Sequence, residues 1–171
     1  ISDTLINRHP DENVLYDIAR LSADAVRFFN DKPVMAMISY SNFGTDTIGS
    51  PQKVHAAVEK MQQEFPNLAI DGEMQVNFAM DKKLRDDKYP FTRLRGKNVN
   101  TLIFSNMSSA NGSYKLLQAL NSDAEIIGPI QMGLKKPIHF TDFECSVRDI
   151  VNITAVAAID AYVEKIKNSK K

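Results

Sequence analysis

Two acidic side chains in the segment IDGEMQ, Asp71 and Glu73, have types and spacing that suggest chemistry. They are two positions apart, and on a strand this spacing puts both carboxylates on the same side of the sheet. Paired carboxylates can bind Mg²⁺ or transfer protons. The same pair is also typical of a polar strand end, or of a salt bridge at a subunit contact, so alone it leaves the chemistry open.

Two polar segments could bind a ligand. SYSNFGTDTIGS contains Ser41 and Asn42, and SNMSSANGS contains Asn106 and Asn111. Exposed amides and hydroxyls ahead of a helix can hold a phosphate or a carboxylate. Neither segment carries a known phosphate-binding fingerprint. Ordinary strand-to-helix loops and helix caps have the same composition, so both interpretations remain.

The segment FTDFECSVRDIV combines a polar turn with the start of a helix. Ser146 and Asp149 match the capping box, in which each side chain binds the backbone N–H of the other residue. Asp149 also favours the positive end of the helix dipole. Cys145 has no base beside it, which favours a packed thiol over a nucleophile. Capping alone explains the second half of this segment.

Charge and composition exclude several classes of function. Lys plus Arg and Asp plus Glu both number 21, so the net charge of zero gives no electrostatic case for nucleic acid or an anionic membrane. No apolar run approaches the roughly 20 residues that span a bilayer. The histidines lack zinc-binding spacing, so we expect no metal site. One cysteine excludes an internal disulfide and fits a cytoplasmic location.

The order of apolar segments predicts how these groups are positioned. Strand and helix patterns alternate, which favours an α/β fold with a mostly parallel sheet. In such a sheet, ligands bind at the carboxyl ends of the strands, where the polar segments lie. The expected strands cover 33–41, 67–75, 98–106 and 124–133, and the expected helices cover 12–29, 51–65, 77–90, 112–120 and 147–167, with Ser50 and Ser146 as caps.

Six ordered segments together resemble the phosphate acetyl/butyryltransferase family: ISDTLIN, MAMISYSNFG, IDGEMQ, VNTLIFSNM, IIGPIQMGLKKPIH and CSVRDIVNITAVAAIDA. The resemblance extends to about Tyr162 and matches the C-terminal half of the family's domain. It implies a three-layer α/β/α fold of the isocitrate/isopropylmalate dehydrogenase type. It also implies that residues 1–171 form a single fragment, with the upstream half absent.

Within that family, SYSNFG and DGEM look most like the C-terminal phosphotransacetylase-like region of large bacterial NADP-dependent malic enzymes. The resemblance implies a regulatory and oligomerising domain that senses acetyl-CoA. The parent enzyme would convert malate to pyruvate with NADP⁺ and Mg²⁺ or Mn²⁺, in malic enzyme domains absent from this chain. The implied partners are a CoA ester, the rest of the malic enzyme chain, and further copies in a homodimer or larger oligomer.

An active acyltransferase that moves an acyl group between CoA and phosphate is the alternative. Catalytic members of the family read roughly LSRGCSxEDIV, so this chain has Asp142 in place of Ser, Phe143 in place of Arg and Glu144 in place of Gly. A guanidinium can hold a phosphate oxyanion in a bidentate fork, and a phenyl ring cannot. The replacement therefore favours a fragment without catalysis of its own, and no residue is assigned a catalytic role.

The candidate ligand-binding residues follow from turn placement and from position within the family. Asp142 and Asp149 mark the former catalytic loop, and the others line the expected cleft for acetyl-CoA or another anion. They are Ser41, Asn42, Asn106, Asn111, Asp142 and Asp149.

Overall fold

The computed structural model describes residues 1–120, 126–143 and 145–169, without the side chains of residues 167 and 168. The chain divides into two compact units, Ile1–Leu116 and Leu117–Lys171. The first unit holds the sheet and the helices packed on it. Each unit is described below by itself.

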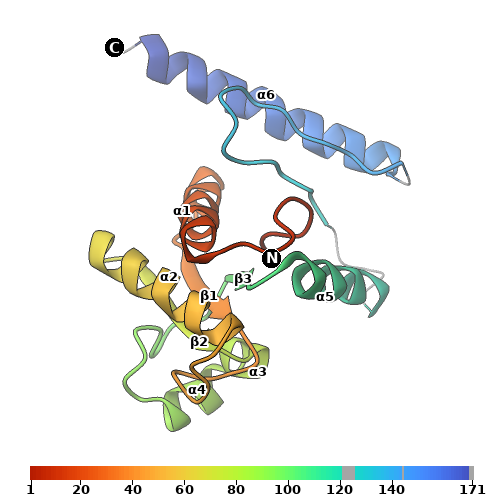
Figure 1. The fold of residues 1–171 in the computed structure, drawn as a ribbon. Coiled ribbons are helices and arrows are strands. Elements are labelled where there is room, and N and C mark those ends of the chain that lie inside the picture. Colours follow the sequence, from red (N-terminus) through yellow and green to blue (C-terminus); the bar gives the residue numbers. More distant parts are fainter. Residues whose placement is uncertain (121–125, 144, 170–171) are drawn as a thin grey trace. The chain divides into compact units, whose positions relative to one another are not determined.

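A parallel three-stranded sheet forms the centre of the first unit (Figure 1). Its strands are β1 (Val34–Ile38), β2 (Ala69–Met74) and β3 (Thr101–Phe104), in the order β2-β1-β3. The central strand β1 is almost entirely apolar and buried, as expected for a strand covered on both faces. Ser2 adds an isolated parallel bridge to Ile103.

Helices cover both faces of this sheet, so the unit has three layers. On one face, α1 (Glu12–Phe28) and α2 (Ser50–Glu64) pack on alternate residues of the strands. On the other face, α3 (Val76–Met80) and α5 (Met107–Leu120) each contribute a buried alanine to a second cluster. The cluster under α1 and α2 includes Leu15, Ile18, Met35, Met37, Val54, Met61, Ile70 and Ile103, and the second cluster includes Ala36, Ile38, Met74, Ala79, Phe104 and Ala110.

The start of α1 agrees with the sequence, and the start of α2 does not. The Asp11 carboxylate accepts hydrogen bonds from the backbone N–H groups of Asn13 and Val14, at 3.0 and 2.9 Å. Ser50 was expected to cap α2, but it is the first residue of the helix and Gly49 occupies the cap position without a side chain. Gly49 has a positive φ of 69°, which a residue without a Cβ adopts readily.

The expected helix over residues 77–90 is divided in two. Helix α3 ends at Met80. Asp81 follows it and caps the next helix, α4 (Lys82–Lys88), by accepting from the Leu84 N–H at 2.9 Å. The Arg85 side chain of α4 is buried and donates to the carbonyls of Ala79, Leu94 and Lys97. The Asp81 cap and the buried Arg85 side chain therefore stabilise two short helices in place of one continuous helix.

In the second unit, the strand expected at 124–133 is wrong for the described residues, since 126–133 form no strand. Pro129 cannot donate a ladder hydrogen bond and Gly128 has a φ of 145°, which both disfavour regular pairing. The long helix α6 (Val147–Ser169) is present and extends two residues beyond its expected end at residue 167. Among the described residues, no helix is both long enough and apolar enough to cross a bilayer.

Candidate functional site

The carboxyl edge of the sheet, between β1 and β3, is the position where a parallel sheet of this topology is expected to bind a ligand. The chain leaves β1 for α2 on one face of the sheet and leaves β3 for α5 on the other. Ligands of open parallel sheets bind where neighbouring connections diverge in this way. The loop at residues 39–49 and the turn at 105–106 flank this point.

Glu73 at the end of β2 holds the loop that follows β1. Its side chain is fully buried, and its Oε1 atom accepts from the Gly44 N–H at 2.6 Å and from the Ser41 hydroxyl at 3.1 Å. The backbone N–H of Phe43 also donates to the Glu73 carbonyl, at 2.8 Å. One residue thus holds three positions of the loop, namely Ser41, Phe43 and Gly44.

Asn42 is fixed by the residue that follows β2. Its Oδ1 atom accepts from the Gln75 N–H at 2.8 Å, and the Gln75 side-chain amide donates to the Tyr40 carbonyl at 2.7 Å. Ser41 and Asn42 are only 3% and 8% exposed. The two predicted residues therefore lie at the expected edge, but their side chains shape the loop from inside.

Tyr40 is the exposed aromatic residue of this loop. Its hydroxyl donates to the Asp46 carboxylate at 3.0 Å, within the same loop. This hydrogen bond raises the pKa of Tyr40, because the phenolate would lose the bond and face the carboxylate's charge. The phenol is therefore a hydrogen-bond donor at neutral pH and does not act as a base.

The second oxygen of Glu73, Oε2, is buried and accepts no hydrogen bond within the described structure. Its neighbour is the Nδ1 atom of His55 on α2, at 3.4 Å, and the Nε2 atom of the same ring lies 3.6 Å from Glu59 Oε1. The imidazole of His55 is half exposed, whereas the Glu73 carboxylate is buried. The sequence assigned His55 no role, but the structure places one of its ring nitrogens beside a buried carboxylate.

Asp71 does not work with Glu73 as a pair. The Asp71 Oδ2 atom accepts from the Thr92 hydroxyl at 2.7 Å and from the Arg93 N–H at 2.8 Å, and its Oδ1 atom accepts from the Gln62 side chain. The Asp71 carboxylate therefore binds the segment at residues 92–93, whereas the Glu73 carboxylate binds the loop at residues 39–49. Within the described part of the chain, no three His, Cys, Asp or Glu side chains form a group that could hold a metal ion.

Asn106 and Asn111 belong to the start of α5. The Asn106 Oδ1 atom accepts from the Ser109 N–H at 3.0 Å, as a helix cap does. The helix begins at Met107, earlier than expected, so Asn111 lies within it and donates to the Thr4 carbonyl at 3.2 Å. Asn106 lies in the expected turn after β3, whereas Asn111 lies inside α5, and both side chains make internal contacts.

The loop before α6, with Asp142 and Asp149, belongs to the second unit, whereas the edge of the sheet belongs to the first unit. Asp142 accepts from the Phe143 N–H at 2.7 Å, and the Phe143 ring is fully exposed. Glu144, the third expected replacement, lies outside the described residues. This loop therefore presents a phenyl ring to solvent.

The capping box at the start of α6 is confirmed. The Asp149 Oδ2 atom accepts from the Ser146 N–H and hydroxyl, both at 2.8 Å, and the Asp149 N–H donates to Ser146 Oγ at 3.2 Å. The hydroxyl and backbone hydrogen bonds from Ser146 lower the pKa of Asp149. A carboxylate stabilised in its charged form is a weaker general base.

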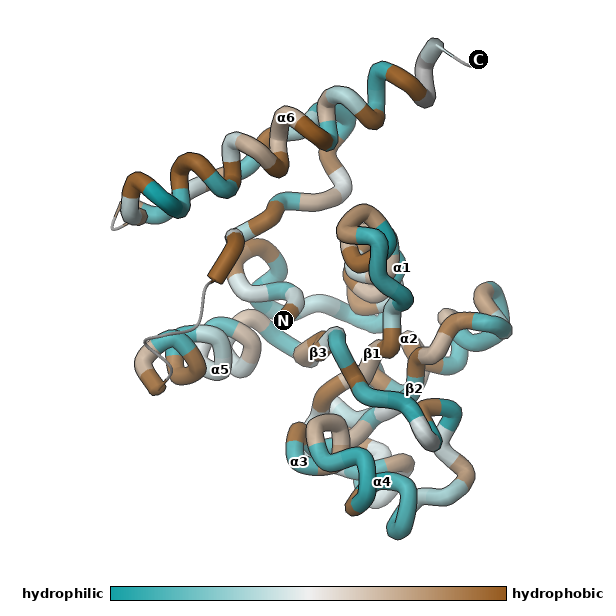
Figure 2. Tube along the Cα trace, turned by 180° about the vertical axis from the view of Figure 1, so that it is seen from behind, coloured by the Kyte–Doolittle hydropathy of each residue, from teal (hydrophilic) through white to brown (hydrophobic). Residues whose placement is uncertain are grey.

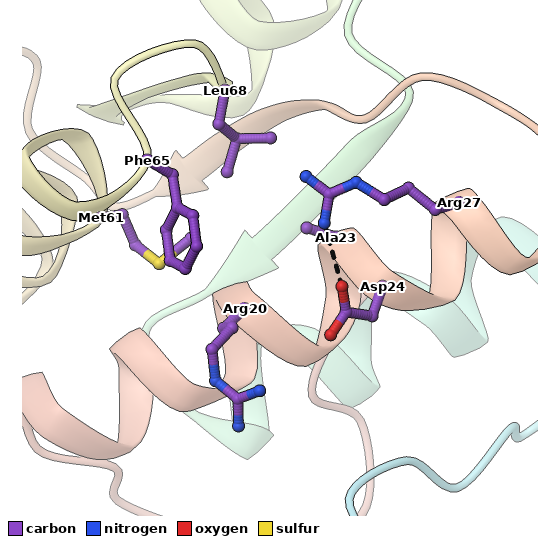
Figure 3. A pocket seen from close by; sticks show the side chains of 7 residues that line it. All are labelled: Arg20, Ala23, Asp24, Arg27, Met61, Phe65 and Leu68. Atoms are coloured by element: carbon purple, nitrogen blue, oxygen red, sulfur yellow. Dashed lines mark hydrogen bonds and ion pairs between the residues drawn. The ribbon is translucent and has the colours of Figure 1, made fainter. Parts of the chain in front are cut away.

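A separate shallow pocket of about 170 Å³ lies between α1 and the C-terminal end of α2 (Figure 3). Met61, Phe65 and Leu68 form an apolar side, and Arg27 faces it with a 2.9 Å bond to Asp24. Leu68 immediately precedes β2, so this pocket is at the amino edge of the sheet, opposite the edge that carries the 39–49 loop. The Arg27 guanidinium is therefore already paired with a carboxylate of the same helix, Asp24.

Sequence reasoning missed the roles of Glu73, Gln75 and His55. Glu73 was noticed as one of two carboxylates, but the distance in sequence between Glu73 and its partner Ser41 hides the contact. A glutamate inside an expected strand was the available signal. Its partner could be found only with the strand order, which places β1 and β2 side by side.

Residues 1–158 match the family described as Phosphate acetyl/butaryl transferase. The NADP-dependent malic enzyme of Escherichia coli strain K12 is 37% identical over 166 residues, which cover 97% of this chain and 22% of that protein. The phosphate acetyltransferase of Clostridium acetobutylicum is also 37% identical, over 94% of this chain and 48% of its own length.

The solved structure of a phosphotransacetylase from Streptococcus pyogenes matches 94% of this chain with a TM-score of 0.85 and 33% identity. The match covers 48% of that chain. The predicted three-layer α/β fold with a parallel sheet is therefore confirmed. The chain spans about a fifth of the length of the malic enzyme relative and about half that of the acetyltransferase relative.

Proposed function

The chain belongs to the Phosphate acetyl/butaryl transferase family, and from this membership we propose that it is a regulatory and oligomerisation domain of a larger NADP-dependent malic enzyme. The observation that carries the proposal is the 37% identity to such an enzyme over 97% of the chain. Since the match covers only 22% of that enzyme, malate chemistry, NADP⁺ and Mg²⁺ or Mn²⁺ would belong to other parts of the polypeptide.

The loop before α6 supports a regulatory role over acyl transfer. Phe143 stands where the catalytic pattern has an arginine, and its exposed ring has no charge to offer an oxyanion. Asp142 adds a negative charge beside it. At about 4 Å and an effective dielectric near 20, a carboxylate repels another unit negative charge by roughly 4 kcal/mol before screening. Acetyl phosphate and phosphate would be disfavoured there.

The proposed ligand is acetyl-CoA, bound at the carboxyl edge of the sheet. Ser41 and Asn42 would act indirectly, because their side chains hold the 39–49 loop in one conformation. A preorganised loop loses little conformational entropy when a ligand binds. Binding of acetyl-CoA would then alter the activity of the malic enzyme domains, within a cytoplasmic homodimer or larger homo-oligomer.

Acetyl-CoA binding by the full-length polypeptide tests this function. We expect calorimetry to show saturable binding, and malate-dependent NADPH formation to change when acetyl-CoA is added. Binding of acetyl-CoA without any change in NADPH formation would contradict regulation. An absence of binding, together with retained malate activity, would indicate that the domain serves assembly alone.

An active phosphate acyltransferase is the second candidate, favoured by one observation. Cys145, Ser146 and Asp149 retain the pattern of the catalytic members, and a phosphate acetyltransferase is 37% identical. This function predicts that the full-length polypeptide forms acetyl phosphate from acetyl-CoA and phosphate. It also predicts loss of that turnover on Asp149→Ala. Robust turnover in the unmodified protein would overturn the non-catalytic proposal.

A further inference from the structure

The buried carboxylate of Glu73 is satisfied on one side only. Its Oε1 atom accepts two hydrogen bonds from the 39–49 loop, whereas its Oε2 atom accepts none within the described part of the chain. The neighbouring strand β1 is apolar along its length, as Figure 2 shows. A buried carboxylate is costly unless an opposite charge lies beside it, because it has lost its hydration. The charge of the group next to Oε2 should therefore affect the whole loop.

His55 on α2 is the group next to this oxygen. Its Nδ1 atom lies 3.4 Å from Glu73 Oε2, and among the residues that the structure describes no other basic side chain is within ion-pair distance of that carboxylate. The imidazole is half exposed, so it can exchange protons with water. Histidine is the side chain that ordinarily changes its charge between about pH 5 and 8. The buried carboxylate therefore has a counter-charge only while this ring is protonated.

The other acidic groups around the ring do not provide an alternative partner. Glu59, one turn further along α2, lies 3.6 Å from the Nε2 atom, but it is largely exposed and such pairs contribute little. In the 39–49 loop, the Asp46 carboxylate accepts from the Tyr40 hydroxyl. On β2, the Asp71 carboxylate is bound by the segment at residues 92–93. The imidazole and the buried carboxylate are thus the pair on which the loop depends.

We propose that His55 is a pH-dependent switch for the 39–49 loop. The protonated ring balances the charge of Glu73, whose Oε1 atom then holds the Gly44 N–H and the Ser41 hydroxyl. Loss of the proton leaves the carboxylate buried without a counter-charge, which favours its hydration and the opening of the loop.

The direction of the pH dependence follows from which state binds the proton. An imidazolium that gains a carboxylate on folding stabilises the folded form at acid pH, and this contribution is lost as the ring deprotonates. The loop should therefore be most ordered below about pH 6 and least ordered above about pH 8. A lower affinity for acetyl-CoA at the higher pH would follow, and this last step alone rests on the proposed function.

Hydrogen exchange of residues 39–49, measured by mass spectrometry on the full-length polypeptide without acetyl-CoA, tests the switch. Variants are compared at the same pH, because the intrinsic exchange rate of amides also changes with pH. His55→Gln is uncharged throughout, and we expect it to exchange about threefold faster than wild type at about pH 5.5 and equally fast at about pH 8. His55→Arg keeps its charge and should retain slow exchange at both. His9→Gln, at an exposed histidine, is the control and should follow wild type.

Two results would overturn the switch. A ratio of His55→Gln to wild-type exchange that is the same at both pH values would mean that the ring acts by its shape and not by its charge. Exchange in His55→Arg as fast as in His55→Gln at the higher pH would mean that a cation beside Oε2 does not hold the loop. Because acetyl-CoA is absent from this experiment, either result leaves the calorimetric test of the proposed function unaffected.

Discussion

Glu73 Oε1 lies 2.6 Å from the Gly44 N–H and is itself fully buried, so the end of β2 determines the shape of the loop after β1. The hydroxyl of Ser41 adds a second donor to the same oxygen. The candidate site is therefore organised by a side chain that a ligand would not touch.

Removing this carboxylate should loosen the loop. Glu73→Ala leaves the Gly44 N–H and the Ser41 hydroxyl without their acceptor, and we expect a loss of about 2–4 kcal/mol in the free energy of unfolding. Chemical denaturation measures the loss, and hydrogen exchange of the Gly44 amide should accelerate. Glu59→Gln, on the exposed surface of α2, is the control and should change neither quantity. Protection of Gly44 in Glu73→Ala would refute the proposed role.

A methyl group at residue 72 should not be tolerated. Gly72 has a φ of 148°, and an added Cβ would lie 2.5 Å from the Met37 carbonyl oxygen on the neighbouring strand. We expect Gly72→Ala to reduce the free energy of unfolding by about 3 kcal/mol or more. Gly112→Ala is the matched control: its Cβ would meet nothing within 4 Å, and the helix should gain about 0.5–1 kcal/mol. Equal stability of the two variants would contradict this account.

Arg85 should be a structural cation. Its guanidinium donates to three carbonyls from two segments and has no exposed surface. We expect Arg85→Met to cost about 3 kcal/mol or more, because three buried acceptors lose their donors. Thermal unfolding of Arg85→Met and of the exposed control Arg95→Ala gives the comparison, and the control should stay within about 0.5 kcal/mol of wild type.

The start of α6 should depend on pH in the acid range. Ser146 lowers the pKa of Asp149 below its ordinary value of 3.8, so the charged carboxylate stabilises the folded helix. This contribution is complete above the unfolded pKa and is lost as the pH falls through the lower folded pKa. Circular dichroism should therefore show an acid loss of helix that Asp149→Asn abolishes, with reduced helix already at neutral pH. An unchanged acid transition in the variant would refute the assignment.

Restoring the catalytic pattern before α6 should increase affinity for anions. The double substitution Asp142→Ser with Phe143→Arg removes one negative charge and adds a guanidinium. Because a bidentate charge-assisted contact is worth about 1.5–3 kcal/mol, we expect acetyl phosphate to bind at least tenfold more tightly to the full-length protein. Phe143→Leu is the neutral control. Equal affinities would show that this loop does not face an anion in the assembled protein.

The fold was predictable because its signals are local. Apolar runs such as that of β1, and caps such as Asp11 and the Ser146–Asp149 pair, depend on residues a few positions apart. The wrong predictions of one helix and one strand arose because the same local signals were misleading there. Asp81 ends one helix and starts another within a pattern that looked continuous, and Pro129 interrupts a run that looked like a strand.

The sequence indicated where Ser41 and Asn106 lie along the chain, but not what their side chains contact. Both residues follow strands of the parallel sheet, as the apolar segments predicted. What each side chain contacts depends on partners that sequence distance hides, as for Asn111 and Thr4, or Glu73 and Ser41. Polar residues in a loop therefore looked like ligand contacts, whereas their hydrogen bonds are internal.

The pairing of Ser2 with β3 has a consequence for any shortened form of this protein. The Ser2 N–H donates to the Leu102 carbonyl and the Ser2 carbonyl accepts from the Phe104 N–H, on the side of β3 away from β1. Without these first residues, β3 becomes an unprotected edge strand with free backbone groups. Such an edge recruits strands from other molecules, so trimming the N-terminus by a few residues should increase aggregation through β3.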